Sequence, residues 1–312
     1  MQKLILATRS SPLALWQANE VTRMLENAGF TTELKAIETI GDKKLNVTLS
    51  KIGDKGVFTK ELEQMLIDGE AHLAVHSAKD MPSSLPDNLE IVAFTEREVP
   101  CDVLVSHKAD FKLENRPVVI GTSSTRRIAT LKRYFPEVQT VPVRGNLQTR
   151  IRKMEEGQCD ALLLAYAGVH RMGYSNLIRE QLDLSVFTPA VGQGSLAIEV
   201  SSELPNELKT RIRSCLEHLP TAICLEAERA FLRKMDGGCS VPVFGFARFE
   251  NEKLIMSGGI VSLDGQEEVR KEFTISNPDR ITAKQAGTDL ANQILSSNGN
   301  SILQKIKQAL HS

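Results

Sequence analysis

Short apolar runs alternate with helix-like segments through the first hundred residues, and this alternation constrains the fold more than any other feature. Ser11 and Pro12 predict a helix start, because serine caps helices and proline fits the first helical residue. A strand–helix–strand order is typical of a mostly parallel sheet with helices on both faces. The expected strands are Leu4–Ala7, Leu34–Ile40, His72–His76 and Leu89–Phe94, with helices from Pro12 to Gly29 and at Thr59–Ile67.

The same alternation begins again after Pro100 and predicts a second α/β domain. Thr188-Pro189 and Gly192-Gln193-Gly194 then interrupt the pattern. The two crossings, near 95–100 and 188–194, suit a hinge with a cleft between two lobes. The expected elements are strands at Asp102–Ser106, Val118–Gly121, Val138–Val143, Ala161–Ala165 and Leu196–Val200, and helices at Thr125–Tyr134 and Glu207–Leu219.

The last hundred residues have a different pattern. A helix is expected at Thr221–Met235, before Gly237-Gly238, and three strand-like runs follow at Val243–Phe249, Lys253–Ser262 and Glu267–Ile275. Asp264-Gly265 is a favoured hairpin turn between the last two runs. We therefore expect a small α+β domain with a three-stranded antiparallel sheet. The expected domains are 1–97 with 194–216, then 98–193, then 217–312.

Charge and cysteine usage exclude several classes of function. The net charge is −1, so no global field would attract nucleic acid or an anionic membrane. No run approaches the roughly 20 apolar residues of a membrane span. The five cysteines are widely spaced without a C-x-x-C pair, and His72 and His76 share no helix, which argues against a metal site. We expect a cytoplasmic protein without a metal, nucleic-acid or membrane partner.

Arginines gather at the ends of the expected strands. Arg126 and Arg127 follow a strand through Thr122-Ser123-Ser124, where a helix N-terminus favours an anion. Guanidinium groups bind carboxylate or phosphate in a bidentate manner, and open α/β sheets bind ligands at strand ends. Each arginine taken alone could equally be a solvated surface charge. The other members of the set are Arg9, Arg144, Arg150 and Arg171.

Two further residues are candidates for chemistry. Asp80 lies between Lys79 and a proline turn after a buried strand, where a carboxylate could act as a general acid–base or simply stabilise the turn. Cys239 lies in a Gly-Gly-Cys-Ser-Val-Pro turn and is the cysteine best placed for covalent work, although a structural role remains open. The loop around Lys51 and Lys55 is glycine-rich, but no Gly-Lys-Ser/Thr follows, so it is not a P-loop.

These motifs together resemble the hydroxymethylbilane synthase (porphobilinogen deaminase) family. The resemblance runs from residue 4 to about residue 245, with a weaker C-terminal part. Each motif is moderately specific alone, and their order along the chain makes the match decisive. They are Ala7–Ala18, Gly53–Glu61, Val75–Pro82, Gly121–Arg127, Val143–Asn146, Leu164–Arg171, Pro189–Gly194 and Gly237–Pro242.

The resemblance implies a fold and a reaction. The first two domains would be similar to type II periplasmic binding proteins with a hinged cleft. A dipyrromethane cofactor would be attached to Cys239 through a thioether, and four porphobilinogen molecules would be added stepwise with loss of ammonia. Asp80 matches the family's catalytic aspartate, the protein would be a monomer, and the linear tetrapyrrole would be released by hydrolysis. The implied cofactor- and substrate-binding residues are Arg9, Ser11, Gln17, Lys51, Lys55, Ser77, Lys79, Thr122, Ser124, Arg126, Arg127, Arg144, Gly145, Asn146, Arg150, Arg171 and Gln193.

Two other classes of protein fit parts of the pattern. Two hinged lobes with arginines would also suit a solute-binding protein, but the apolar run at the N-terminus is too short for a signal peptide. The same arginines could handle phosphoryl groups, but neither a P-loop nor an evident magnesium-binding carboxylate cluster accompanies them. Val99 and Cys101 depart from the family pattern at the first crossing, and we interpret them as hinge variation.

Overall fold

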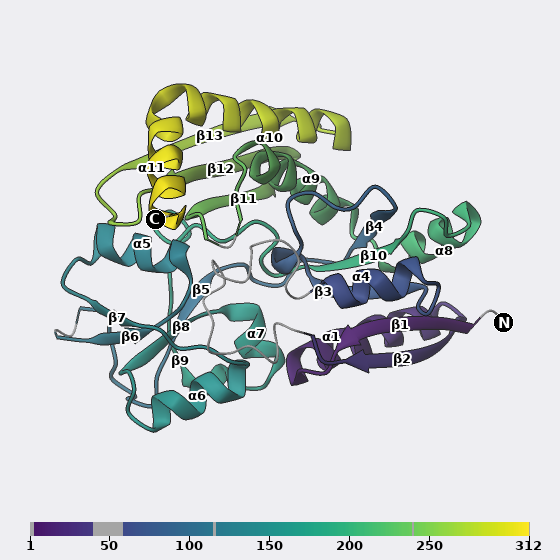
Figure 1. The fold of residues 1–312 in the computed structure, drawn as a ribbon, viewed down its shortest axis with the longest axis horizontal. Helices are drawn as coiled ribbons and strands as arrows, with labels where there is room; N and C mark the ends of the chain where they lie inside the picture. Colours follow the sequence, from purple (N-terminus) through teal and green to yellow (C-terminus); the bar gives the residue numbers. More distant parts are fainter. Residues whose placement is uncertain (1–2, 40–58, 115–116, 239, 312) are drawn as a thin grey trace.

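The computed structural model describes residues 3–39, 59–114, 117–238 and 240–311, and in these residues the strands form three sheets. Two of the sheets have five strands each and the third has three. Figure 1 shows them as three groups, with the N-terminal sheet at the right, the second sheet at the lower left and the third at the top.

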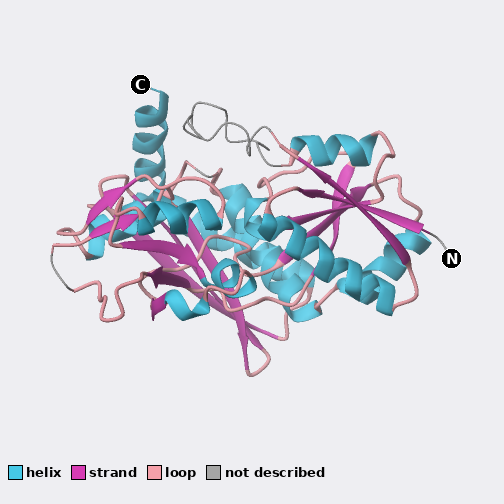
Figure 2. Cartoon of the chain, turned by 90° about the horizontal axis from the view of Figure 1, so that it is seen from below, coloured by secondary structure: helices cyan, strands magenta, loops and turns pink. Residues whose placement is uncertain are grey.

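The first lobe is the sheet β2-β1-β3-β10-β4 with the helices that cover it. β10 runs antiparallel to β3 and β4, whereas β1 is parallel to β2 and β3. Leu4 and Leu6 pack under α1 and α8 on one face, while Ala7 packs against α4 on the other, so helices cover both faces (Figure 2). The elements are β1 (Lys3–Arg9), α1 (Pro12–Asn27), β2 (Thr31–Ile37), α4 (Lys60–Ile67), β3 (Leu73–Ser77), β4 (Leu89–Phe94), β10 (Leu196–Ser201) and α8 (Asn206–Leu216).

The second lobe repeats this arrangement with the strand order β7-β6-β8-β5-β9. Its antiparallel strand, β5, again occupies the fourth place and pairs with β8 and β9. Leu131 of α5 packs on one face, and Ile151 of α6 and Val169 of α7 pack on the other. The elements are β5 (Asp102–Val105), β6 (Val119–Gly121), α5 (Thr125–Tyr134), β7 (Gln139–Val141), α6 (Leu147–Glu155), β8 (Ala161–Ala165), α7 (Tyr166–Arg171) and β9 (Ile178–Gln181).

The two crossings between the lobes lie side by side. The amide of Glu98 in the first crossing donates to the carbonyl of Gly194 in the second at 3.1 Å. Gly194 has a φ of +99°, and a Cβ there would lie 2.4 Å from the Glu98 oxygen, so this approach requires glycine. The first crossing leads directly into β5 and the second into β10, so the antiparallel strand of each lobe follows a crossing.

The third unit is the antiparallel sheet β11 (Val243–Glu250), β12 (Lys253–Val261) and β13 (Glu268–Ser276), with helices α9 (Leu219–Lys234), α10 (Arg280–Ile294) and α11 (Asn300–His311). α11 projects at the C-terminus (Figure 2). Glu228 of α9 is fully buried; its carboxylate pairs with Arg97 of the first crossing at 2.7 Å and accepts the Gly192 amide of the second at 2.8 Å. The third unit thus contacts both crossings through the carboxylate of Glu228.

The expected α/β class and the three-stranded third sheet are confirmed. The hairpin turn at Asp264-Gly265 joins β12 and β13, with Gly265 at a φ of +78°. The helix predicted over Glu207–Leu219 ends at Leu216, because Leu219 already begins α9. Three short elements, α6, α7 and β9, were not predicted; segments of nine, six and four residues carry too little periodicity to be recognised.

Candidate active site

Asp80 lies at the end of β3, where the chain turns toward the crossings. A single 3₁₀ turn, Ala78–Asp80, follows the strand, and the carboxylate is exposed. The second crossing packs against this turn so closely that a Cβ on Gly192 would lie 2.7 Å from the Ala78 carbonyl carbon. Asp80 is therefore held at the junction between the lobes.

Neutral hydrogen-bonding groups and Arg9 lie near Asp80 in the first lobe. Gln17 of α1 is buried and donates through Nε2 to the Ser77 hydroxyl at 2.8 Å. Ser11 caps α1, because its hydroxyl accepts the Ala14 amide at 3.4 Å. A small cavity of about 20 Å³, large enough for about one water molecule, is lined by Arg9, Gln17, Ser77 and Asp80, among others.

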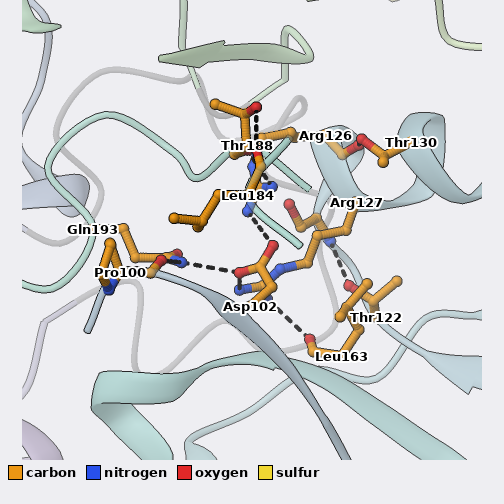
Figure 3. A network of polar contacts seen from close by, with 11 residues as sticks. Pro100, Asp102, Thr122, Arg126, Arg127, Thr130, Leu163, Leu184, Thr188 and Gln193 are labelled. Atoms are coloured by element: carbon orange, nitrogen blue, oxygen red, sulfur yellow. Dashed lines mark hydrogen bonds and ion pairs between the residues drawn. The ribbon is translucent and has the colours of Figure 1, made fainter. Parts of the chain in front are cut away.

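Arg126 and Arg127 begin α5 in the second lobe and converge on one carboxylate. Arg126 Nη2 donates to Asp102 Oδ2 at 2.8 Å, and Arg127 Nη2 donates to Asp102 Oδ1 at 2.7 Å (Figure 3). Both arginines are only 6% exposed and Asp102 is fully buried. Gln193 of the second crossing completes the group, donating to Asp102 Oδ1 at 3.0 Å and to the Pro100 carbonyl at 2.6 Å.

The Asp102 carboxylate is ionised despite its burial. Burial raises its pKa, but the charges of Arg126 and Arg127 outweigh that effect and hold the pKa far below the usual range. Thr122 and Ser124 flank the arginines; the Thr122 hydroxyl accepts the Ser124 amide at 3.3 Å. The local sequence thus supplies a strand, a polar turn and a helix start that together place two guanidinium groups inside the lobe.

Charges from the two lobes act on each other across the junction. Burial, and next the charge of Arg127 in the second lobe, lower the pKa of Lys79 in the first lobe to about 8. Burial and Arg127 likewise lower the pKa of Arg150 to about 10, while Asp80 of the first lobe opposes that change. Charged groups that follow strand ends in the two lobes are therefore close enough to act on each other.

The loop before α6 carries three of the expected residues. Asn146 caps the helix, since its Oδ1 accepts the Thr149 amide at 2.9 Å. Gly145 has a φ of +117°, and its carbonyl accepts Arg150 Nε at 2.7 Å. The carbonyl of Arg144 accepts Lys153 Nζ at 3.1 Å. These bonds hold the loop against α6, and Arg150 lies close enough to Arg127 of α5 for that charge to lower its pKa.

Arg171 lies elsewhere, at the contact between the lobes. Its Nη2 donates to the Gly194 carbonyl at 2.7 Å, and its guanidinium lies 5.4 Å from the centre of the Trp16 ring in α1. This residue thus joins α7 of the second lobe to α1 of the first and to the second crossing. Its position suits a role in lobe arrangement as well as in binding.

Sequence reasoning missed Asp102. Its signal was a charged residue at the start of an otherwise apolar run, which needs a buried partner. Three expected site residues, Lys51, Lys55 and Cys239, lie outside the described residues. The expected absence of a metal site stays a prediction, although no group of metal-binding side chains occurs in 3–39, 59–114, 117–238 or 240–311.

The side chains at the junction of the two lobes suit an anionic ligand. The charge of Arg127 contributes to lowering the pKa of Lys79, Arg126 and Arg150, and the carboxylates of Asp80 and Asp102 are their acidic neighbours. The Nε groups of Arg126 and Arg127 are buried and have no hydrogen-bond partner. An excess of desolvated cations with unused donors fits a ligand that carries several carboxylates, as dipyrromethane does.

Comparison with known proteins decides the family. A family model described as "Porphobilinogen deaminase, dipyromethane cofactor binding domain" matches residues 4–209, and one described as the C-terminal domain matches 222–296. The chain belongs to the porphobilinogen deaminase family. It is 50% identical over 305 residues to the porphobilinogen deaminase of Desulfosudis oleivorans, covering 97% of both chains, and 51% identical over 306 residues to that of Cytophaga hutchinsonii, covering 98% of this chain and 97% of the relative.

Family membership confirms the expected class of enzyme, a transferase of the porphobilinogen deaminase (hydroxymethylbilane synthase) type. Among solved structures, the methionine-binding protein MetQ aligns with a TM-score of 0.43 at 10% identity, over 68% of this chain and 89% of MetQ. That likeness is too distant to add to the family assignment. A search of the described residues found no helix long and apolar enough to cross a membrane.

Proposed function

We propose that this chain joins four porphobilinogen molecules head to tail, with loss of one ammonia at each addition, on a dipyrromethane primer. The primer is attached to Cys239 by a thioether, and hydrolysis releases the linear tetrapyrrole. The observation that supports the proposal is the excess of cations, with Arg126 and Arg127 buried and Lys79 and Arg150 half-buried, where the two lobes meet beside the exposed carboxylate of Asp80.

The cationic groups of both lobes bind the carboxylates of the growing chain. Each pyrrole unit carries an acetate and a propionate, so the lengthening product is a polyanion. Placing those carboxylates inside a cleft is costly unless each is paired. The groups proposed for this role are Arg9, Arg126, Arg127, Arg144, Arg150, Arg171, Lys51, Lys55 and Lys79, with polar support from Ser11, Gln17, Ser77, Thr122, Ser124, Gly145, Asn146 and Gln193.

Asp80 is the proposed catalytic residue. Its carboxylate is exposed at the lobe junction, where it can stabilise positive charge that develops as the amine leaves. It can also accept a hydrogen bond from a pyrrole nitrogen and hold a proton during bond formation. The bound cofactor supplies the pyrrole carbon to which the first substrate is joined.

One carboxylate must serve every addition, which favours relative movement of the lobes. The crossings at 95–100 and 188–194 run side by side and suit a hinge. We propose the three domains 1–97 with 194–216, 98–193 and 217–312, with the hinge between the first two. We further propose a cytoplasmic monomer that needs no metal.

Intact mass spectrometry of the denatured chain tests the proposal. The wild-type chain should carry an adduct equal to two pyrrole units, because a thioether survives denaturation and thiol reductants. Cys239→Ala should lack the adduct and turn over no porphobilinogen. Cys215→Ala is the matched control, since Cys215 is a partly exposed free cysteine on α8, and it should keep the adduct.

Two outcomes would contradict the proposal. An active wild-type chain with an unmodified Cys239 would exclude the thioether primer. A chain that binds porphobilinogen without releasing ammonia would instead be a solute-binding protein.

A further inference from the structure

Asp102 forms ion pairs with two arginines that are adjacent on a helix, where neighbouring side chains point in different directions. Neighbouring residues on an α-helix point about 100° away from each other. Arg126 and Arg127 nevertheless reach the two oxygens of one carboxylate, at 2.8 and 2.7 Å. Without that charge, two guanidinium groups, each 6% exposed, would lie together without compensation.

The arrangement leaves one donor group of each arginine unused, as in the buried ion pair of Arg97 with Glu228. Each arginine donates one Nη to Asp102 and the other to a main-chain carbonyl, that of Thr188 or of Leu163, both at 2.9 Å. The Nε of each is buried without a partner. A buried donor without a partner is destabilising, and these two Nε groups are the donors that remain for a ligand carboxylate.

The same carboxylate is connected to both crossings. Asp102 follows the first crossing directly, and Gln193 of the second donates to Asp102 and to Pro100 (Figure 3). Thr188, at the start of the second crossing, accepts Arg126 through its carbonyl. A movement of one crossing relative to the other must therefore displace Asp102, Gln193 or Thr188, which hold the two arginines in place.

We propose that Asp102 is a positioning residue for the known reaction: with Gln193, it fixes Arg126 and Arg127 for carboxylate binding and makes their arrangement depend on the hinge. This inference rests on the proposed function, in which the two arginines bind the carboxylates of primer and substrate. Asp102 touches neither ligand; it acts through the arginines.

The test compares Asp102→Asn with Asp160→Asn in the full chain. Asp160 is the control because it is also a carboxylate with a cationic partner, Lys108. It lies at the opposite end of β8 from Asp102, which pairs with Ala165 at the end of that strand. Asp102→Asn should raise the KM for porphobilinogen and slow primer uptake by primer-free chain, roughly 10–100-fold, since small misplacements of binding groups cost that much. Asp160→Asn should leave both unchanged.

A second measurement separates positioning from folding. The pKa of Lys79, followed by NMR of ¹³C-dimethylated lysines in primer-free chain, should fall in Asp102→Asn, because the Asp102 charge supports the protonated amine. Asp160→Asn should not change it. Asp102→Glu, which keeps the charge, should restore the Lys79 titration and part of the uptake rate.

Gln193→Met provides a milder variant if Asp102→Asn does not fold, because it removes only the amide that reaches Asp102 and Pro100. It should shift KM in the same direction by a smaller factor. Wild-type KM and uptake in folded Asp102→Asn, or equal losses in Asp160→Asn, would overturn the inference. Failure of the proposed function is distinguishable, because then the wild-type chain would carry no adduct while the Lys79 titration would still respond to Asp102.

Discussion

The two lobes have the same strand order but differ in the charged groups that they place at their junction. The first lobe contributes the exposed carboxylate of Asp80, with Arg9 and Lys79 near it and the hydrogen-bonded pair Gln17 and Ser77. The second lobe contributes a buried arginine pair and Arg150. The shared topology supplies strand ends in both lobes, and the residues that follow those ends decide that the candidate catalytic carboxylate lies in the first lobe and the buried arginine pair in the second.

The antiparallel strands show the same contrast in the interior. In the first lobe, Glu199 of β10 is fully buried beside His76, whose Nε2 lies 3.1 Å from Glu199 Oε2, and Glu199 Oε1 has no partner. In the second lobe, Asp102 of β5 has two arginine partners. The fourth strand of each sheet thus carries a buried carboxylate, at different positions along the strand: Glu199 pairs with Ala74 inside β3 and has a weakly basic partner, whereas Asp102 pairs with Ala165 at the end of β8 and has two arginines.

The largest effect should come from removing the chemistry of the first lobe. Asp80→Asn should fold and keep its primer, because the side chain is exposed, but it should lose about 10²–10⁴-fold in turnover, as expected for a group that stabilises charge and moves protons. Steady-state release of ammonia measures the loss. Asp87→Asn, an exposed carboxylate in the loop before β4, is the control, and wild-type turnover in Asp80→Asn would remove this residue from the mechanism.

Removing one arginine of the second lobe should affect stability and binding together. Arg127→Leu leaves Asp102 with one charged partner, so the free energy of unfolding in urea should fall by about 3 kcal/mol. Primer uptake should also slow. Arg152→Leu removes an exposed arginine of α6 that lies 3.8 Å from Glu156, and it should change stability by less than about 0.5 kcal/mol. Equal changes in the free energy of unfolding would mean that Arg127 contributes no more to stability than an exposed surface charge.

A Gly→Ala substitution in a crossing should destabilise the chain more than the same substitution in a turn within a lobe. Gly194→Ala places a methyl group against the Glu98 carbonyl at a φ of +99°, whereas Gly157→Ala has a φ of +81° and open space around it. The left-handed conformation costs about 1–2 kcal/mol in both variants. The clash with the Glu98 oxygen adds to this cost only in Gly194→Ala, so this variant should lower the free energy of unfolding by more than Gly157→Ala. Calorimetry of both variants checks this order, and equal losses would mean that the crossings can separate easily.

The smallest effect is a pH dependence that links the lobes. Because Lys79 has a pKa of about 8, its amine loses its charge above that pH, and primer uptake should fall there by a few fold. The unfolded chain, with a lysine pKa near 10.5, binds more protons between these values, so the Lys79 contribution to the free energy of unfolding rises with pH as uptake falls. Lys79→Arg should remove the loss of uptake; an unchanged alkaline profile would mean that another group titrates.

The sequence predicted the positions of most strands because burial and periodicity are local properties. β4, β8 and α5 have the predicted bounds, and the β12–β13 hairpin forms at Asp264-Gly265. The arginines at strand ends were also recognisable, since adjacent guanidinium groups after a strand and a polar turn suggest an anion site. The state of those arginines was not predictable, because their partner, Asp102, lies more than twenty residues earlier in the chain.

The sequence by itself determined the family, the α/β class and the candidate carboxylate, because ordered motifs and alternating apolar runs are properties of the linear chain. Only the tertiary structure decided that Asp102 joins both arginines, that Gln193 connects them to the crossings, and that Lys79 faces the second lobe. The physical reason is that the energy of a buried charge depends on its neighbours in space, and folding brings those neighbours together from distant parts of the chain.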